Sequence, residues 1–417
     1  MRSLRRLLVV LIVSLPRGAS PQGGTPLGPE FRVNTFTTGS QLAPAVSVDV
    51  FGTFVVVWES PQDGSGLGVF AQRFNGSGMP LGPEFRVNTF TTGNQSAPAV
   101  TAEIDGFFEV VWVSELQDGS GLGIFGQRFT PIGTPDGAEF RVNSYTTGDQ
   151  LAPSIVVEKS TIFMVVWESD GQDGSGPGIF GQRFIGAGPP LGGEFRVNTA
   201  TTGAQRSPIV GTNQGGTFFI AWESDGQDGS NSGVFAQRYS DAGFPQGPEF
   251  RANSFTTGNQ LAPAVGASGN RFVVVWQSQD QDGSGYGVFG QRYNFDGTPL
   301  GPEFQVNSFV AGDQSQPAAA NDISADFAVV WQSAAQDGDG AGVFGQRYAN
   351  TGTPDGPEFR VNTYITGTQN HPSVAAAFGG NFVVAWTSDQ QDGSAYGVFG
   401  QRYGPIVPVE LMRLGVE

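Results

Sequence analysis

Residues 52–74 read GTFVVVWESPQDGSGLGVFAQRF, and residues 84–88 read EFRVN. The first stretch contains an apolar, β-branched run that ends at Trp58, a Gln-Asp-Gly turn, and a second run that ends at Phe74. Short runs of this kind, bounded by Gly, Pro, Asn and Asp, are typical of β-strands joined by tight turns. The stretch therefore predicts antiparallel strands and no helix.

The same stretch recurs along the whole chain at a nearly constant period. All seven tryptophans occupy one position of this repeat and lie 54 or 55 residues apart: Trp58, Trp112, Trp167, Trp222, Trp276, Trp331 and Trp386. A period of this length predicts a solenoid or a propeller, in which every repeat is one supersecondary unit.

Each repeat predicts four strands, which in the first full copy are residues 44–48, 54–58, 69–74 and 84–88. The second strand is apolar on both faces, as expected for a sheet that is covered on both sides. Four antiparallel strands in each of seven units predict an all-β, seven-bladed β-propeller.

The two ends of the repeat array are complementary. The chain contains a fourth strand at residues 30–34 with no strands before it, and the last repeat stops after its third strand at Tyr403. The N-terminal strand is therefore predicted to complete the last blade and close the ring, since an open array would expose two sheet edges.

The first 20 residues have the pattern of a secretory signal peptide. Arg2, Arg5 and Arg6 precede an apolar run over residues 7–15, and small residues follow at 18–20. Residues 21–404 are then the propeller and 405–417 a C-terminal tail, and we expect a bacterial secreted or cell-envelope protein whose mature chain does not insert into a membrane. An uncleaved anchor or a misassigned start codon is the alternative.

Across residues 30–403 the repeat resembles one found in large secreted or surface proteins of bacteria, most of them uncharacterised. Calcium-binding or adhesion modules often accompany that family's repeat. The strand order is also similar to the propeller of the Tol translocation protein, in which an outer N-terminal strand closes the ring. The resemblance implies an exported propeller and names no ligand.

Composition limits the partners. The chain has 38 acidic and 21 basic residues, a net charge of −17, which argues against nucleic acid and anionic membranes because both bind clustered Lys and Arg. It has no cysteine and one histidine, so disulfides, thiolate metal sites and multi-histidine zinc sites are excluded. Glycans, polymer surfaces, proteins and cations remain as partners, and we expect a monomer.

The Gln-Asp-Gly turn is the strongest polar candidate, because all seven repeats contain it. Its carboxylates are candidate Ca²⁺ ligands, since hard oxygen donors on a glycine-rich loop suit this ion. In the alternative interpretation each Asp bonds the backbone of its own turn. The seven residues are Asp63, Asp118, Asp173, Asp228, Asp282, Asp337 and Asp392.

Arginine also repeats in two positions of the unit. Seven arginines follow Gln in the third strand, from Arg73 to Arg402, and six follow Glu-Phe, from Arg32 to Arg360, with Gln305 in the seventh place. They predict either sites for carboxylates or sugars, which Arg can bind in bidentate fashion, or ion pairs with nearby acids that tie strands or blades together.

A single catalytic site on a ring axis requires residues that differ between blades. His371, Arg206, Glu109 and Lys159 are each unique to one repeat. His371 and Arg206 are the candidate ligand-binding residues. We expect a non-enzymatic, repetitive binding, adhesion or structural module for a glycan or protein. A calcium-binding surface module and a glycan hydrolase or lyase with an axial site are the alternatives.

Overall fold

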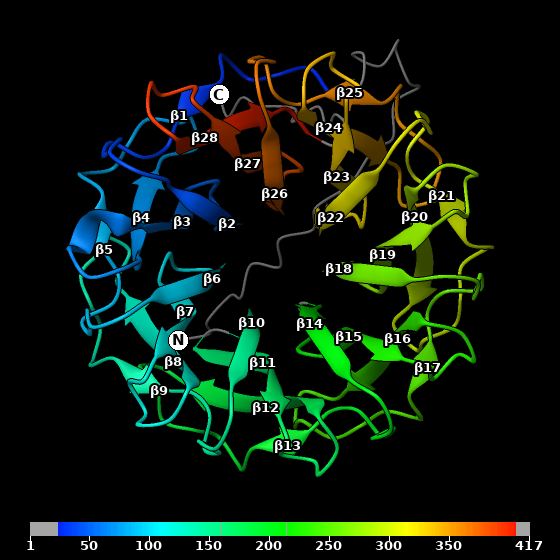
Figure 1. Cartoon of the computed structure of the whole chain (residues 1–417), viewed down its shortest axis with the longest axis horizontal. Helices are drawn as coiled ribbons and strands as arrows, with labels where there is room; N and C mark the ends of the chain where they lie inside the picture. The colour runs from blue at the N-terminus through cyan, green and yellow to red at the C-terminus, as the bar shows by residue number, and fades with distance from the viewer. Residues whose placement is uncertain (1–23, 160, 214, 406–417) are drawn as a thin grey trace, which may run out of the picture.

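The computed structural model describes residues 24–159, 161–213 and 215–405. It contains seven four-stranded antiparallel sheets arranged as blades around one axis (Figure 1), so the predicted seven-bladed β-propeller is confirmed. Within each blade the first strand lies nearest the axis and the fourth lies outermost.

The blades have the following strands. Blade 1 is β2 Leu42–Val48, β3 Phe54–Ser60, β4 Gly68–Phe74 and β5 Phe85–Arg86; blade 2 is β6 Gln95–Ala102, β7 Phe108–Glu115, β8 Leu122–Phe129 and β9 Phe140–Arg141; blade 3 is β10 Gln150–Lys159, β11 Ile162–Asp170, β12 Pro177–Ile185 and β13 Phe195–Arg196; blade 4 is β14 Gln205–Thr212, β15 Phe218–Asp225, β16 Ser232–Tyr239 and β17 Phe250–Arg251. Blade 5 is β18 Gln260–Ser268, β19 Arg271–Gln279, β20 Tyr286–Asn294 and β21 Phe304–Gln305; blade 6 is β22 Gln314–Asn321, β23 Phe327–Ala334, β24 Ala341–Tyr348 and β25 Phe359–Arg360; blade 7 is β26 Gln369–Ala376, β27 Phe382–Asp389, β28 Tyr396–Tyr403 and β1 Phe31–Arg32. A 3₁₀ turn, η1, covers Pro61–Asp63.

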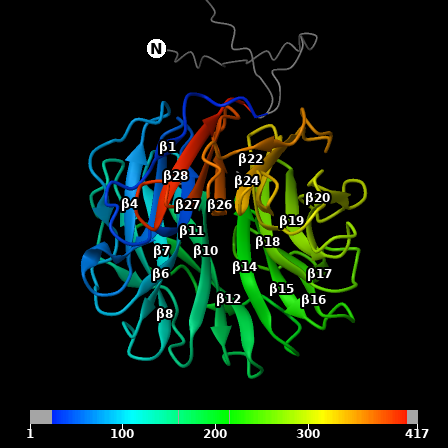
Figure 2. The same ribbon diagram turned by 45° about the horizontal axis from the view of Figure 1, so that its top comes forward.

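The ring closes as the chain ends predict. Strand β1 pairs with β28 in register Phe31 to Gly400 and Arg32 to Phe399, and both belong to the sheet of blade 7. Figures 1 and 2 show blue β1 beside red β28 at this seam. The predicted signal peptide lies outside the described residues, as does the predicted tail beyond Pro405.

Two predicted strand limits are wrong. The first strand begins before its proline, at Leu42 in blade 1, because a bulge between Leu42 and Ala45 lets the ladder continue past Pro44. The fourth strand has only two residues, Phe85 and Arg86 in blade 1. Beyond it the side chain of Asn88 replaces the ladder, because its Oδ1 accepts a hydrogen bond from the Val69 N–H at 2.8 Å.

The hydrophobic core lies between the blades. Val55 and Val57 of blade 1 pack in one cluster with Val110, Trp112 and Phe125 of blade 2, and the same arrangement recurs around the ring. Every tryptophan is fully buried. Covering each sheet on both sides in this way explains the apolar second strands.

A glutamate before each fourth strand joins consecutive blades. In blade 2, Glu139 Oε2 accepts hydrogen bonds from the N–H and hydroxyl of Thr89 in the loop that leaves blade 1, at 2.6 and 2.9 Å. Its Oε1 accepts another from the Gln117 amide of its own blade. Glu30 makes the same contacts with Thr363 and Gln391 at the seam, so the seam is held like the other joints.

The two ends of the ring differ in the loops they carry. One end, called the loop face below, holds the Gln-Asp-Gly turns and the Thr-Thr-Gly loops between blades, which contact each other through the bond from the Leu67 N–H to Asn94 Oδ1 at 3.1 Å. The antiparallel order puts the strand-one-to-two turns and the strand-three-to-four connections at the opposite end, called the turn face. Among the described residues no helix is long and apolar enough to cross a membrane.

Candidate functional site

The Gln-Asp-Gly carboxylates bond within their own blades. Asp118 Oδ1 accepts a hydrogen bond from the Ser120 N–H at 3.2 Å, and its Oδ2 accepts one from the Asn143 amide at 3.2 Å. A Cβ placed on Gly123 would lie 2.6 Å from this Oδ2, so glycine is required there to make room for the carboxylate. These contacts favour the structural interpretation of the turn.

The other six turns share the bond from the second following N–H, which is 3.5 Å long at Asp337; they contain Asp63, Asp173, Asp228, Asp282, Asp337 and Asp392. An Asn amide donates to Oδ2 in five blades, whereas the Oδ2 atoms of Asp63 and Asp173 are buried without a hydrogen-bond partner among the described residues. Within the described part of the chain, no group of three or more His, Cys, Asp or Glu side chains could hold a metal ion. Calcium binding at these turns stays a prediction, and it is tested below.

Arg206 and His371 lie on the loop face at bulges of the innermost strands. Each of the seven bulges contains a residue other than glycine with positive φ, including Ser207 at 52° and His371 at 50°. In five blades the N–H of the bulge residue donates to a side chain of the preceding blade, as His371 does to Gln316 Oε1 at 3.2 Å. The blades thus place variable side chains around one end of the axis.

Arg206 has acidic neighbours. Its Nη1 lies 3.3 Å from Glu168 Oε1, and the other carboxylate oxygen of Glu168 accepts the Ser207 N–H at 3.4 Å. Burial raises the pKa of both Glu168 and Glu223 above the ordinary value, while the Arg206 charge opposes the rise. His371 lies on β26 of blade 7, three blades away from Arg206. Partial burial lowers the pKa of its imidazole. The sequence identified both residues but not the two glutamates around Arg206.

Glu109 is located elsewhere. It lies on β7 at its turn-face end, buried, and Arg128 Nε contacts it at 3.0 Å while Arg128 Nη2 contacts Glu103 at 2.7 Å. Burial, together with a hydrogen bond to Glu103 and its charge, raises the pKa of Glu109 well above the ordinary value. Glu109 and His371 therefore lie in different blades and at opposite ends of their strands, and they do not form one axial site.

The repeated arginines follow the predicted ion pairing only in part. Arg128, Arg183 and Arg347 of the third strands pair with acids. Others instead donate to backbone carbonyls of the next blade, as Arg238 Nη1 does to Phe295 O at 2.8 Å and Arg292 Nη1 to Asn350 O at 2.9 Å. The glutamates before the fourth strands bind Ser, Thr and Gln of neighbouring segments, as described above, so the arginines that follow Glu-Phe are left near the surface.

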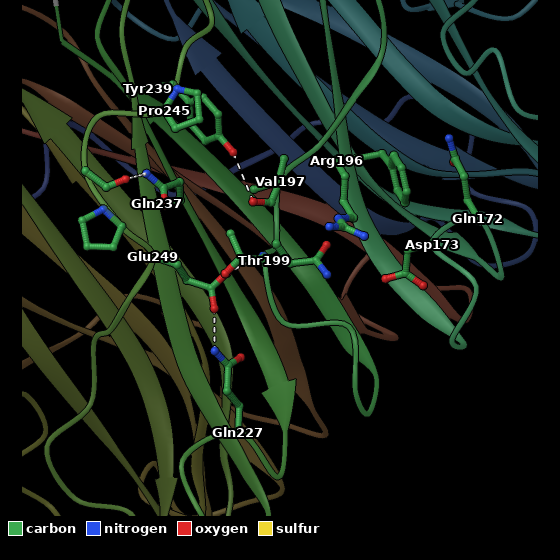
Figure 3. A pocket seen from close by; sticks show the side chains of 14 residues that line it. Gln172, Asp173, Arg196, Val197, Thr199, Gln227, Gln237, Tyr239, Pro245 and Glu249 are labelled. Carbon is green, nitrogen blue, oxygen red and sulfur yellow. Dashed lines mark hydrogen bonds between the residues drawn. The ribbon is translucent and has the colours of Figure 1, made fainter.

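A cleft of about 640 Å³ opens between blades 3 and 4 on the outside of the ring (Figure 3). Arg196, Asp173 and Gln172 line one side, and Tyr239 and Pro245 line the other. Its remaining lining residues are Phe180, Val197, Asn198, Thr199, Gln227, Gln237, Gly247, Pro248 and Glu249.

Fixed polar contacts form the wall of this cleft. Glu249 Oε2 accepts hydrogen bonds from the N–H and hydroxyl of Thr199 at 2.7 and 2.9 Å. Tyr239 donates its hydroxyl proton to the Val197 carbonyl at 3.2 Å, and burial raises its pKa. Among the described residues the Arg196 side chain makes no hydrogen bond or ion pair, whereas the equivalent Arg251 donates its Nε–H to the Asn253 carbonyl at 2.9 Å and keeps its two terminal nitrogens free.

An equivalent cleft of about 590 Å³ lies between blades 4 and 5. Arg251 and Ser254 replace Arg196 and Thr199 there, and Tyr293 replaces Tyr239. The sequence shows these residues as repeated positions, but it does not show that strands of neighbouring blades bring them to one cleft.

Comparisons with known proteins show the fold. No family model and no curated protein matches the chain. A protein of unknown function from Dyadobacter fermentans matches with a TM-score of 0.52 at 10% identity, covering 74% of this chain and 94% of that one. The β-propeller domain of the trilobed protease from Pyrococcus furiosus gives 0.49 at 8% identity, covering 89% and 96%. An endo-arabinase from Bacteroides thetaiotaomicron gives 0.38 at 14%, covering 65% and 95%. The first likeness supports the propeller fold, and none of them shows an activity.

Proposed function

We propose that the protein is a non-enzymatic binding module that holds a repetitive glycan through equivalent clefts between its blades. The observation that carries the proposal is the recurrence, at two consecutive blade joints, of a cleft lined by an Arg, an Asn, a Ser or Thr, a Gln, a Tyr and a Pro at equivalent positions. A repeated site gains avidity when the ligand itself repeats.

The chemistry of the cleft fits sugars. Arg196 offers planar donors that can reach hydroxyl or carboxylate oxygens. Amide and carboxylate groups of Gln172, Gln227 and Asp173 surround it, and Pro245 and Pro248 add apolar surface. A mixture of this kind fits a polyhydroxylated ligand better than an apolar one, and an open cleft admits a polymer chain.

The test uses retention on immobilised neutral and uronic-acid polysaccharides. A variant with all six cleft-position arginines changed to Gln, the residue found naturally at position 305, removes the guanidinium from every equivalent position. These arginines are Arg32, Arg86, Arg141, Arg196, Arg251 and Arg360. We expect retention of at least one polysaccharide by the wild type, and at least tenfold weaker binding by the variant.

Arg206→Gln is the matched control, because Arg206 is an exposed arginine outside the clefts. The proposal predicts that this change leaves retention unaltered. Loss of binding in Arg206→Gln with full binding in the sixfold variant would place the ligand on the loop face near the axis and overturn the proposal. Equal affinity for the polymer and for a short oligosaccharide would contradict the multivalent mode.

A further inference from the structure

The exposed apolar side chains of the ring gather at one end. Thirteen large apolar residues are exposed in the described parts of the chain, and three of them, Leu116, Val310 and Ile365, lie on the loop face. The other ten lie at the opposite end, nine of them in strand-one-to-two turns or strand-three-to-four connections and Ile185 at the end of β12: Leu27, Phe51, Met79, Ile104, Ile132, Ile185, Leu191, Phe244, Ile323 and Phe378. The turn face is therefore the apolar end of the molecule.

The exposure at this end is large. Phe51 is 80% exposed, Ile132 74% and Phe244 67%, while Met79 and Ile104 are 60% and 58% exposed. Burial of apolar surface is favourable. A cluster of exposed apolar side chains therefore marks an interaction surface more often than a single exposed apolar side chain does.

Contacts join the turns of blades 7, 1 and 2 into one surface. In blade 1, a Cβ on Gly76 would lie 3.3 Å from the Gly52 carbonyl oxygen, so the turns that carry Phe51 and Met79 touch. In blade 2, a Cβ on Gly106 would lie 3.3 Å from the Pro131 side chain, which joins the turns of Ile104 and Ile132.

The same surface continues across the seam. The Arg402 guanidinium of blade 7 donates to the Gly76 carbonyl at 2.7 Å and to the Leu27 carbonyl at 2.6 Å. Between blades 1 and 2, a Cβ on Gly133 would lie 3.2 Å from the Arg73 side chain, so the apolar tips of the three blades form one continuous array.

This array carries few charges. Its turns cover residues 24–28, 50–53, 75–80, 104–107, 130–134 and 378–381, and Asp105 is the one charged residue within them. The Arg402 guanidinium also reaches between two of the turns, where backbone carbonyls accept its hydrogen bonds. Exposed acids such as Asp170, Asp225 and Asp339 lie on the loop face. The array thus suits an uncharged apolar partner, while the net charge of −17 opposes an anionic one.

Both described ends of the chain lie at this face. Pro26 forms an isolated bridge with Tyr403, and the Pro405 carbonyl accepts a hydrogen bond from Arg347 Nη1 at 3.0 Å. The sequence after Pro405 continues with the mostly apolar stretch IVPVELM at 406–412. This stretch therefore follows the ring at the same end as the apolar tips.

From these observations we propose that the turn face of blades 7, 1 and 2 docks on a zwitterionic lipid surface, with Phe51, Met79 and Ile132 entering the headgroup region. Apolar side chains bind such an interface by burying area, and anionic lipid adds repulsion for an acidic protein. In this orientation the loop face points away from the lipid. The docking proposal does not depend on the proposed glycan clefts.

Vesicle sedimentation tests the proposal with the chain from residue 21, which contains every strand and contact of the described ring. We expect binding to phosphatidylcholine vesicles, and weaker binding when about a third of the lipid is phosphatidylglycerol. The variant Phe51→Ser/Met79→Ser/Ile132→Ser should bind at least tenfold more weakly. The matched control Leu116→Ser/Val310→Ser/Ile365→Ser removes as many exposed apolar groups from the loop face and should bind like the wild type.

Melting curves keep the comparison interpretable, because all six side chains are exposed and both variants should melt with the wild type. Three results would overturn the proposal: no sedimentation of the wild type with any vesicle, equal binding by the two variants, or tighter binding to the anionic vesicles. Self-association of the wild type that the turn-face variant abolishes, without vesicle binding, would assign the surface to a second copy of the chain and also overturn it.

Discussion

At the scale of residues, the Gln-Asp-Gly aspartate shows what a repeat can and cannot reveal. The sequence shows aspartate at this position in all seven repeats, and one of its two interpretations is a bond to the backbone of the same turn, which the Ser120 N–H makes to Asp118. The second partner, Asn143, lies 25 residues away, just after the fourth strand of the blade. A hydrogen-bond partner within the same turn can be predicted from the residue types of that turn. A partner on another strand can be predicted only once the pairing register of the strands is known.

Glu109 leads to a prediction about pH. Its raised pKa means that the folded protein keeps a proton that the unfolded chain releases above about pH 4.5. The folded state then binds more protons, so the free energy of unfolding falls as pH rises, by up to about 1.4 kcal/mol per pH unit for one group. Glu103, Arg128 and Asp136 are the charged groups that face it.

Glu109→Gln removes this titration while keeping a hydrogen-bond donor toward Glu103. We expect the variant to gain stability over the wild type as pH increases from 5 to 8, measured by urea unfolding at each pH. Asp105→Asn, an exposed acid in the adjacent turn, is the control and should follow the wild type. Parallel curves for wild type and Glu109→Gln would contradict the assignment of a buried, protonated carboxyl.

At the scale of elements, the apolar runs of the sequence predict the positions of the strands better than they predict the residues at which the strands end. The second strand of blade 1 contains the predicted residues 54–58 and extends to Ser60. The first strand passes through its proline because a positive-φ residue such as Ala43 forms a bulge, which the composition of the strand does not announce. Fourth strands are short because Asn side chains take over their ladder positions.

The Gln-Asp-Gly turn gives the second prediction. Its carboxylate already accepts an N–H and, in five blades, an amide, so a cation would have to displace both donors there and one donor at Asp63 and Asp173. We expect the melting midpoint to stay constant when calcium and then a chelator are added. One occupied site at 100 times its dissociation constant adds about 2.7 kcal/mol, so a rise of several degrees that Asp173→Asn reduces would instead establish a calcium module.

At the scale of the whole molecule, the count of blades and the closure of the ring both follow from the sequence, because period and incomplete ends are global properties of the chain. The clefts and the apolar turn face do not follow, since they join residues of different blades. Arg196 and Tyr239, which line one cleft, are 43 positions apart and belong to adjacent repeats.

The seam gives the third prediction. Phe31 packs its ring 5.3 Å from that of Phe74, and its equivalent Phe85 packs 5.4 Å from Phe129. Replacing either with Ala should cost about 3 kcal/mol of unfolding free energy. Because β1 and its partner strand β28 come from opposite ends of the sequence, only noncovalent contacts hold β1 in blade 7, and Phe31→Ala should also release the strand.

Limited proteolysis distinguishes the two variants. Cleavage within residues 24–40 should accelerate in Phe31→Ala and remain at the wild-type rate in Phe85→Ala. Equal protection of this segment in both variants would show that the remaining seam contacts hold β1 without Phe31.

Glu30 repeats at the seam the bonds that Glu139 makes inside the chain. The joint at the seam is therefore chemically equivalent to the joint between blades 1 and 2. A circular permutant that begins in another turn of the turn face, with the present ends linked, should fold into the same ring. Gain or loss of a whole blade by recombination between near-identical repeats then needs only a ring that can still close.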